Sequence, residues 1–207
     1  MLTPPPGRRA VFSAALLCFA IAPLAAYAES AAIAPVERLY DALLGVMKLG
    51  TAVPFEQRYT QLAPTIEAVF DMSAILQTSV GLGWSQLSAD QHAALLTAFR
   101  RYTVATYVAN FNQFDGQRFE VSPTTRALPE NEQLVTSRVI PVSGDTHELD
   151  YVMRQDPTGW RAVDVLAEGA ISRVAVQRSD FRRLLMQGGG AALLASLQRK
   201  ANDLAHG

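Results

Sequence analysis

The sequence predicts an α+β fold in which helices pack against an antiparallel sheet. Between residues 35 and 114, apolar side chains recur at intervals of three and four, which is typical of amphipathic helices. From Gly116 to Ala167 the spacing changes to two, as in strands, and after Ile171 it returns to three and four. The order helices, sheet, helices favours a four-stranded twisted antiparallel sheet packed with about six helices.

The first 28 residues have the pattern of a secretory signal peptide. Arg8 and Arg9 precede a long apolar run that ends in Ala26-Tyr27-Ala28, an A-x-A cleavage pattern. We therefore expect cleavage after Ala28; an uncleaved membrane anchor is the alternative. Cys18 lies inside the apolar run and follows Leu17, where a lipoprotein signal would need a small residue.

Residues 29–207 are expected to form one exported domain. Removal of residues 1–28 takes away the one cysteine, which excludes disulfides, thiol nucleophiles and cysteine-based zinc sites. The formal net charge falls from −1 to −3, because residues 1–28 carry two arginines and no acidic residue. This charge argues against a nucleic-acid partner, which would require a basic surface.

The predicted helices follow one another along the first half. The first begins at Pro35 and stops at Gly50, and residues 54–84 form two or three short helices interrupted by Pro64 and Gly81. A long helix follows over residues 88–114, where Ser88 and Gln91 have the spacing of a capping box.

The predicted strands come next, with turn residues between them. The last three are separated by the turns VSGDT and QDPTG, so neighbours in sequence should pair as an antiparallel meander. The strands are expected at Gln117–Ser122, Gln133–Val142, Thr146–Gln155 and Trp160–Ala167. Two helices, residues 171–187 and 191–207, then flank Gly188–Gly190.

Catalytic and metal-binding patterns are absent from the sequence. His92, His147 and His206 share no ligand spacing, and the segment GLGW lacks the third glycine of a dinucleotide loop. No metal site, cofactor or catalytic residue is therefore expected. Asp164 lies in the middle of a strand between two valines; it is either paired structurally or, with Tyr151, the general base of a small isomerase or hydrolase.

Apolar residues are more numerous than one sheet face requires. The strand at residues 160–167 is apolar on both faces: Val163 and Val165 lie on one, Trp160 and Leu166 on the other. Helices on both faces of the sheet would explain this pattern, and so would an open slot that holds an apolar ligand. Val163 and Val165 are the residues we expect to line such a slot.

Ordered segments along the chain resemble the MlaC family of periplasmic lipid-binding proteins, also called the toluene-tolerance family. They are RYTQLAPTIEAVFD, GLGWSQLSADQHAALLTAFRRYTVATYVANF, DGQRFEV, LDYVMRQDPTGWRAVDVLAEG and RSDFRRLL. The resemblance covers residues 36–197.

The resemblance implies a lipid carrier that is not an enzyme. It implies an apolar pocket between sheet and helices, and a monomeric periplasmic shuttle between an inner-membrane ABC transporter complex and an outer-membrane component. The lipid is then cargo rather than cofactor. The pocket is expected to be lined by Phe70, Ile75, Leu82, Trp84, Phe99, Tyr102, Tyr107, Val139, Leu149, Tyr151, Met153, Val163, Val165 and Ile171.

The cargo is expected to be a phospholipid or a hopanoid. After Glu168-Gly169 the stretch AISRVAVQRSDF is about one residue longer than the usual family pattern, which is similar to the hopanoid-associated HpnM branch. A periplasmic adaptor with a filled core is a further alternative, in which no lipid would be bound.

Overall fold

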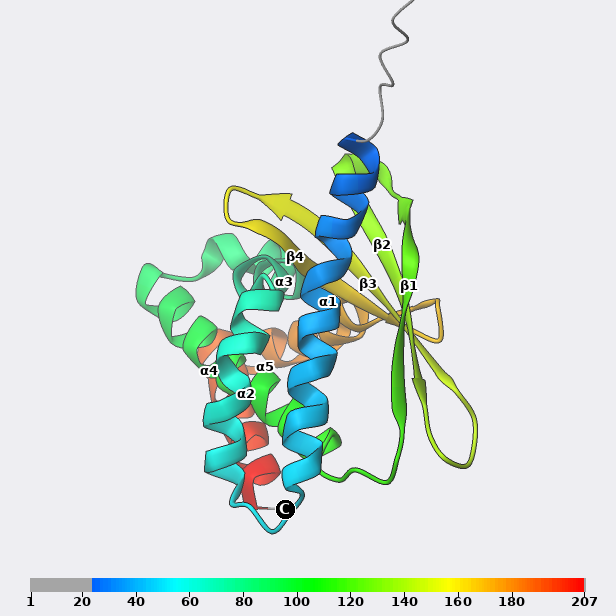
Figure 1. Cartoon of the computed structure of the whole chain (residues 1–207). Helices are drawn as coiled ribbons and strands as arrows, with labels where there is room; N and C mark the ends of the chain where they lie inside the picture. The colour runs from blue at the N-terminus through cyan, green and yellow to red at the C-terminus, as the bar shows by residue number, and fades with distance from the viewer. Residues whose placement is uncertain (1–23, 207) are drawn as a thin grey trace, which may run out of the picture.

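Five α-helices and a five-stranded sheet make up the computed structural model, which describes residues 24–206 (Figure 1). The helices are α1 (Leu24–Leu49), α2 (Phe55–Val69), α3 (Met72–Val80), α4 (Ala89–Asn110) and α5 (Arg173–His206). The strands are β1 (Arg118–Ala127), β2 (Glu132–Ile140), β3 (His147–Asp156), β4 (Gly159–Ala167) and β5 (Ile171–Ser172). Two short 3₁₀ helices, η1 (Gly81–Gln86) and η2 (Pro129–Asn131), complete the order.

The sheet is an antiparallel meander in the order β1-β2-β3-β4-β5. The α+β class and the pairing of neighbouring strands are thus confirmed, but the expected number of four strands is wrong. β5 has only two residues, which pair with Leu166 and Ala167. Two residues are too few to produce an alternating pattern in the sequence.

Two of the expected helices are joined into α5. The helix runs from Arg173 to His206, with backbone angles outside the helical range at Gly188 and Gly189, the latter at a φ of 61°. Glycine adopts this left-handed conformation without the steric cost of a side chain. The glycine segment therefore kinks α5, and about six expected helices become five.

α1 lies between α2 and the sheet (Figure 1). Its buried side chains, including Leu39, Tyr40 and Leu43, contact both α2 and the strands. The helix begins at Leu24, before the expected Pro35, and contains Pro35 within it. The signal peptide expected over residues 1–28 lies mostly outside the described residues, and its cleavage point after Ala28 falls in the backbone of α1.

The start of α4 confirms the capping box. The Ser88 hydroxyl accepts a hydrogen bond from the Gln91 amide at 3.2 Å, and the Gln91 side chain accepts one from the Ser88 amide at 2.9 Å. These bonds satisfy amide groups that a helix start leaves without partners. α4 carries Leu95, Phe99 and Val108 into the core.

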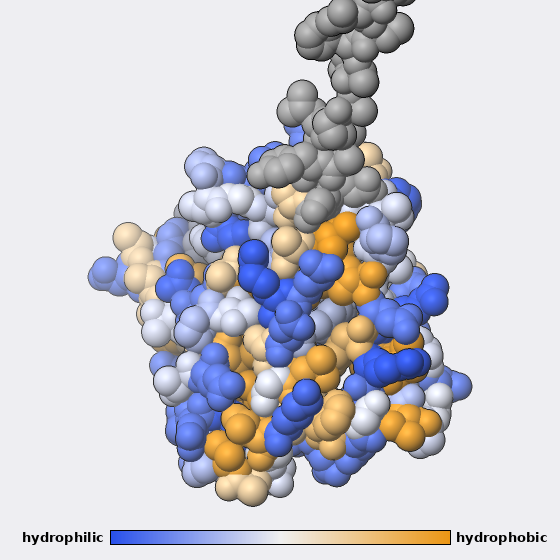
Figure 2. Space-filling view, viewed as in Figure 1, coloured by the Kyte–Doolittle hydropathy of each residue, from blue (hydrophilic) through white to orange (hydrophobic). Residues whose placement is uncertain are grey.

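The surface has a mixed character on the face that Figure 2 shows, where small apolar patches lie among polar ones. Apolar atoms form a large share of most protein surfaces, so this mixture is ordinary. No helix within residues 24–206 combines the length and the hydropathy needed to cross a bilayer.

Candidate functional site

A cavity of about 320 Å³ lies between the helices and strands β3 and β4. Its wall is built from α3, α4, β3, β4 and the first turns of α5, so it depends on elements about a hundred residues apart in sequence. Its volume lies near the lower limit for small-molecule sites. The lining residues are Phe70, Met72, Ile75, Phe99, Tyr102, Thr103, Thr106, Tyr107, Asn110, Phe111, Leu149, Asp164, Val165, Ala167, Arg173, Val174 and Gln177.

A β-bulge in β4 decides which of its residues face the cavity. Met153 pairs with Ala162 and Val152 pairs with Asp164, which leaves Val163 as an extra residue on β4. Directly paired residues of antiparallel strands point to the same side of the sheet. Ala162 therefore shares a face with Val165, which pairs with Tyr151, although a regular strand would place them on opposite faces.

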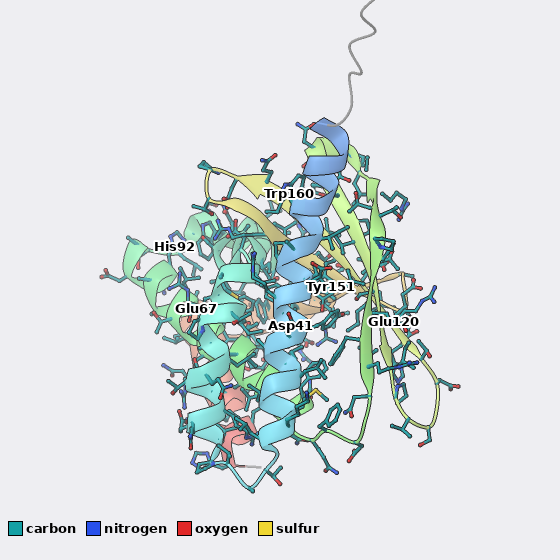
Figure 3. All side chains as sticks on the ribbon, in the orientation of Figure 1. Asp41, Glu67, His92, Glu120, Tyr151 and Trp160 are labelled. Atoms are coloured by element: carbon teal, nitrogen blue, oxygen red, sulfur yellow. The ribbon has the colours of Figure 1, made fainter. Side chains whose placement is uncertain are left out.

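Aromatic side chains form the inner wall. The Phe70 ring lies 5.6 Å from that of Tyr107 and 6.3 Å from that of Tyr151, measured between ring centroids. Tyr151 is fully buried and lies beside α1 (Figure 3), where its ring meets that of Tyr40 edge-on with the centroids 6.1 Å apart. The wall that a ligand would touch is thus largely apolar and partly aromatic.

A chain of hydroxyl groups supports this wall from behind. The Tyr151 hydroxyl donates to that of Tyr40 at 3.2 Å, and the Tyr40 and Ser137 hydroxyls are bonded at 2.5 Å. Ser137 donates in turn to the Leu149 carbonyl at 2.5 Å, so its single proton is used and it accepts from Tyr40. The hydroxyls of Tyr151, Tyr40 and Ser137 therefore all have hydrogen-bond partners, as buried polar groups require.

Burial favours the neutral phenols in this region. It raises the pKa of Tyr40, of Tyr107 and of Tyr151, because the charged phenolate would lose its hydration. Tyr40 raises the pKa of Tyr107 further, and Tyr107 and Tyr40 both raise the pKa of Tyr151. These phenols are hydrogen-bonding groups at neutral pH rather than bases.

Stability should therefore fall steeply at alkaline pH. The pKa values of these tyrosines in the folded protein lie above the value of about 10 in the unfolded chain. Their contribution to the free energy of unfolding is therefore fully present below about pH 10, and it is lost as the pH rises through the folded pKa values. In the pH range where a tyrosine is protonated in the folded state but ionised in the unfolded state, it lowers the free energy of unfolding by about 1.4 kcal/mol per pH unit. Urea unfolding between neutral pH and pH 11.5 measures this, and Tyr107→Phe should make the slope shallower. An unchanged slope in that variant would contradict the assignment.

Asp164 anchors the start of α5. Its Oδ1 accepts hydrogen bonds from the amides of Val165 at 2.7 Å and Val174 at 3.1 Å, and its Oδ2 accepts one from the Ser172 hydroxyl at 2.5 Å. Ser172 also accepts from the amide of Ala175. Both carboxylate oxygens thus hold backbone and hydroxyl donors in place, which is a structural use of the residue.

The residues expected to line the pocket divide into two groups. Half of them lie in the cavity wall: Phe70, Ile75, Phe99, Tyr102, Tyr107, Leu149 and Val165. The other half lie elsewhere: Leu82, Trp84, Val139, Tyr151, Met153, Val163 and Ile171.

Each residue outside the wall has a physical reason for its position. Leu82 and Ile171 are 92% and 54% exposed, on η1 and on the edge strand β5. Trp84 instead stacks on His92, with ring centroids 3.9 Å apart. His92 lies at the start of α4, away from Tyr151 (Figure 3).

The remaining four residues are all in the sheet. Tyr151 and Met153 are fully buried in the core behind the wall. Val139 is on β2, two strands from β4, and pairs with Phe119 and His147. Val163 is the extra residue of the bulge.

Sequence reasoning missed the polar part of the wall. Thr103, Asn110, Arg173 and Gln177 line the cavity but carry no apolar signal. Helical spacing could have identified two of them, since Thr103 and Asn110 follow Phe99 and Thr106 at intervals of four on α4. Within the described part of the chain, no three His, Cys, Asp or Glu side chains are grouped as a metal site.

Comparison with known proteins gives one family and one fold. The family described as "MlaC protein" matches residues 37–199. Among solved structures, the phospholipid-binding protein from Ralstonia solanacearum, in complex with a phospholipid, aligns with a TM-score of 0.72 and 22% sequence identity. The alignment covers 84% of this chain and 98% of that chain, and at this identity it shows a shared fold. No curated protein matches the chain.

Proposed function

This chain belongs to the MlaC protein family, and we propose on that basis that it is a lipid carrier whose cargo occupies the cavity between α4, α5 and the sheet. The observation that carries the proposal is the cavity itself, with an inner wall of Phe70, Phe99, Leu149 and Val165 and a polar part formed by Arg173 and its neighbours. Such a division suits a molecule with an apolar body and a polar end.

The energetics of a carrier require few polar contacts. Each methylene removed from water contributes about 0.8 kcal/mol, so an acyl chain in the cavity is strongly held out of water. A membrane offers the acyl chain a similar apolar environment. A carrier that must release its cargo therefore needs an affinity for the lipid that is only comparable to that of the membrane. Shape and apolar contact meet that requirement, and the direction of transfer is then set by differential binding to partners.

The phospholipid-binding relative supports a phospholipid as the cargo class. The longer segment between Gly169 and Phe181 is the feature that favours a hopanoid instead, as in the HpnM branch. We propose that the chain is exported after cleavage of residues 1–28 and acts as a periplasmic monomer. Its partners in this proposal are an inner-membrane ABC transporter complex and an outer-membrane component.

The isomerase or hydrolase alternative depends on Asp164 and Tyr151. Both carboxylate oxygens of Asp164 accept hydrogen bonds from the start of α5. The Tyr151 hydroxyl donates a hydrogen bond to the Tyr40 hydroxyl, behind the wall. These contacts give both side chains structural partners, which favours the carrier over the enzyme.

Native mass spectrometry of the protein purified from its own periplasm tests the proposal. We expect the mature chain, beginning after Ala28, with one lipid bound at near-stoichiometric occupancy. Extraction and identification of the lipid then distinguishes a phospholipid from a hopanoid. An empty protein that also takes up no lipid from vesicles would contradict the carrier and favour the adaptor.

A further inference from the structure

Among the described residues, only two that carry a charge lie in the wall of the cavity, Asp164 and Arg173. The hydrogen bonds of Asp164 to Val165, Ser172 and Val174 use both of its oxygens. Arg173 differs from it. It is exposed at the first position of α5, and within residues 24–206 it makes no hydrogen bond or ion pair.

Several other arginines have protein partners. Arg101 bonds Glu56 at 2.8 Å, Arg154 bonds Glu132 at 2.6 Å, and the buried Arg58 donates to two backbone carbonyls. The guanidinium groups of these arginines are thus occupied by protein groups, whereas that of Arg173 remains available at the cavity.

The charge of Arg173 acts on the cavity wall. Burial and the nearby Tyr40 raise the pKa of Tyr107, and the positive charge of Arg173 opposes this rise. Tyr107 is itself a lining residue. The guanidinium therefore lies close enough to influence groups that a ligand would contact.

Two neutral donors accompany Arg173. Gln177 lies four residues later on the same side of α5 and also lines the cavity. Its Oε1 accepts a hydrogen bond from Ser79 at 3.2 Å, which leaves its amide NH₂ group to donate elsewhere. The hydroxyl of Thr103, on the facing helix α4, is buried and has no hydrogen-bond partner among the described residues.

We propose that Arg173, assisted by Gln177, binds the phosphate of a lipid headgroup and so selects phosphate-bearing lipids over uncharged lipids with the same acyl chains. This inference rests on the proposed carrier function and adds to it the residue that sets the headgroup class. A guanidinium can donate two parallel hydrogen bonds to a phosphate, which an ammonium group cannot do in the same geometry. Because Arg173 is exposed, the contact gives selectivity without preventing release.

Competition between two lipids of equal chain composition tests the inference. The purified protein is incubated with vesicles of dioleoylphosphatidylglycerol that contain a minor fraction of dioleoylglycerol, and the bound lipids are quantified by native mass spectrometry. The wild type should be enriched in phosphatidylglycerol relative to the vesicle composition. Arg173→Gln should reduce this enrichment about tenfold while uptake of dioleoylglycerol is unchanged.

Matched variants separate the local effect from general ones. Arg182→Gln removes an exposed arginine of the same helix outside the cavity wall and should retain the wild-type ratio. Arg173→Lys keeps the charge without the planar fork and should give an intermediate ratio. Thermal unfolding of all three variants shows whether the fold is intact.

The outcomes distinguish this inference from the carrier proposal. Undiminished enrichment in Arg173→Gln, or a wild type that binds both lipids in proportion to the vesicle, would overturn the role of Arg173 and leave the carrier standing. A wild type that binds neither lipid would contradict the carrier itself, and the role of Arg173 with it.

Discussion

Replacement of Val165 by tryptophan should prevent lipid loading while the protein stays folded. Val165 lines the cavity from β4, and its cross-strand partner Tyr151 fixes the direction of its side chain. The indole ring at this position would occupy the space of roughly three methylene groups of the bound acyl chain. That exclusion corresponds to about 2.4 kcal/mol, or a roughly fiftyfold loss of affinity. Native mass spectrometry after incubation with phospholipid vesicles measures it.

Val163→Trp is the matched control for this prediction. Val163 is two residues away on the same strand, but as the extra residue of the bulge it does not line the cavity. The same bulky residue should therefore leave loading unchanged. Equal loss of loading in both variants would mean that the bulge does not decide which residues face the ligand.

Replacement of Asp164 by alanine should have the largest effect on stability among the cavity residues with a structural role. The substitution removes three hydrogen bonds that the carboxylate accepts, two from backbone amides and one from Ser172. Loss of a charged acceptor at a helix start costs about 2–3 kcal/mol in the free energy of unfolding. Urea unfolding at neutral pH provides the measurement.

Asp164→Asn refines the test. Its amide oxygen can still accept from the Val165 and Val174 amides, so we expect a smaller loss of about 1 kcal/mol. Phospholipid loading should persist in this variant, because the apolar wall is unchanged. If Asp164→Asn kept its stability and its bound ligand but lost a turnover seen in the wild type, the enzymatic alternative would replace the carrier.

Local patterns in the sequence predicted most of the elements. Ser88 and Gln91 identified the start of α4 because a capping box depends on residues three apart, a relation that tertiary contacts do not alter. The turn residues between β2, β3 and β4 predicted an antiparallel meander for the same reason. β5 could not be predicted, since a two-residue strand exists only through its pairing with Leu166 and Ala167.

The site was less accessible to sequence reasoning. Val163 and Val165 were grouped because residues two apart share a face of a regular strand. The bulge separates them, and it is defined by the pairing of β4 with β3 rather than by β4 alone. Arg173 carries no apolar signal, so its position in the cavity wall appears only when α5 packs against β4.

By itself, the sequence determined the α+β class, most helix and strand positions, and the resemblance to a lipid-binding family, because spacing and turn residues act over a few positions. Only the tertiary structure decided which apolar side chains surround the cavity and which fill the core. Tyr151 and Val165 show the reason: both are apolar strand positions, and directly paired, yet one is packed behind the wall and the other lines it. A sequence shows the same apolar pattern whether a side chain packs against other protein atoms or lines a space for a ligand. Only the packing of elements that are distant in sequence distinguishes the two cases.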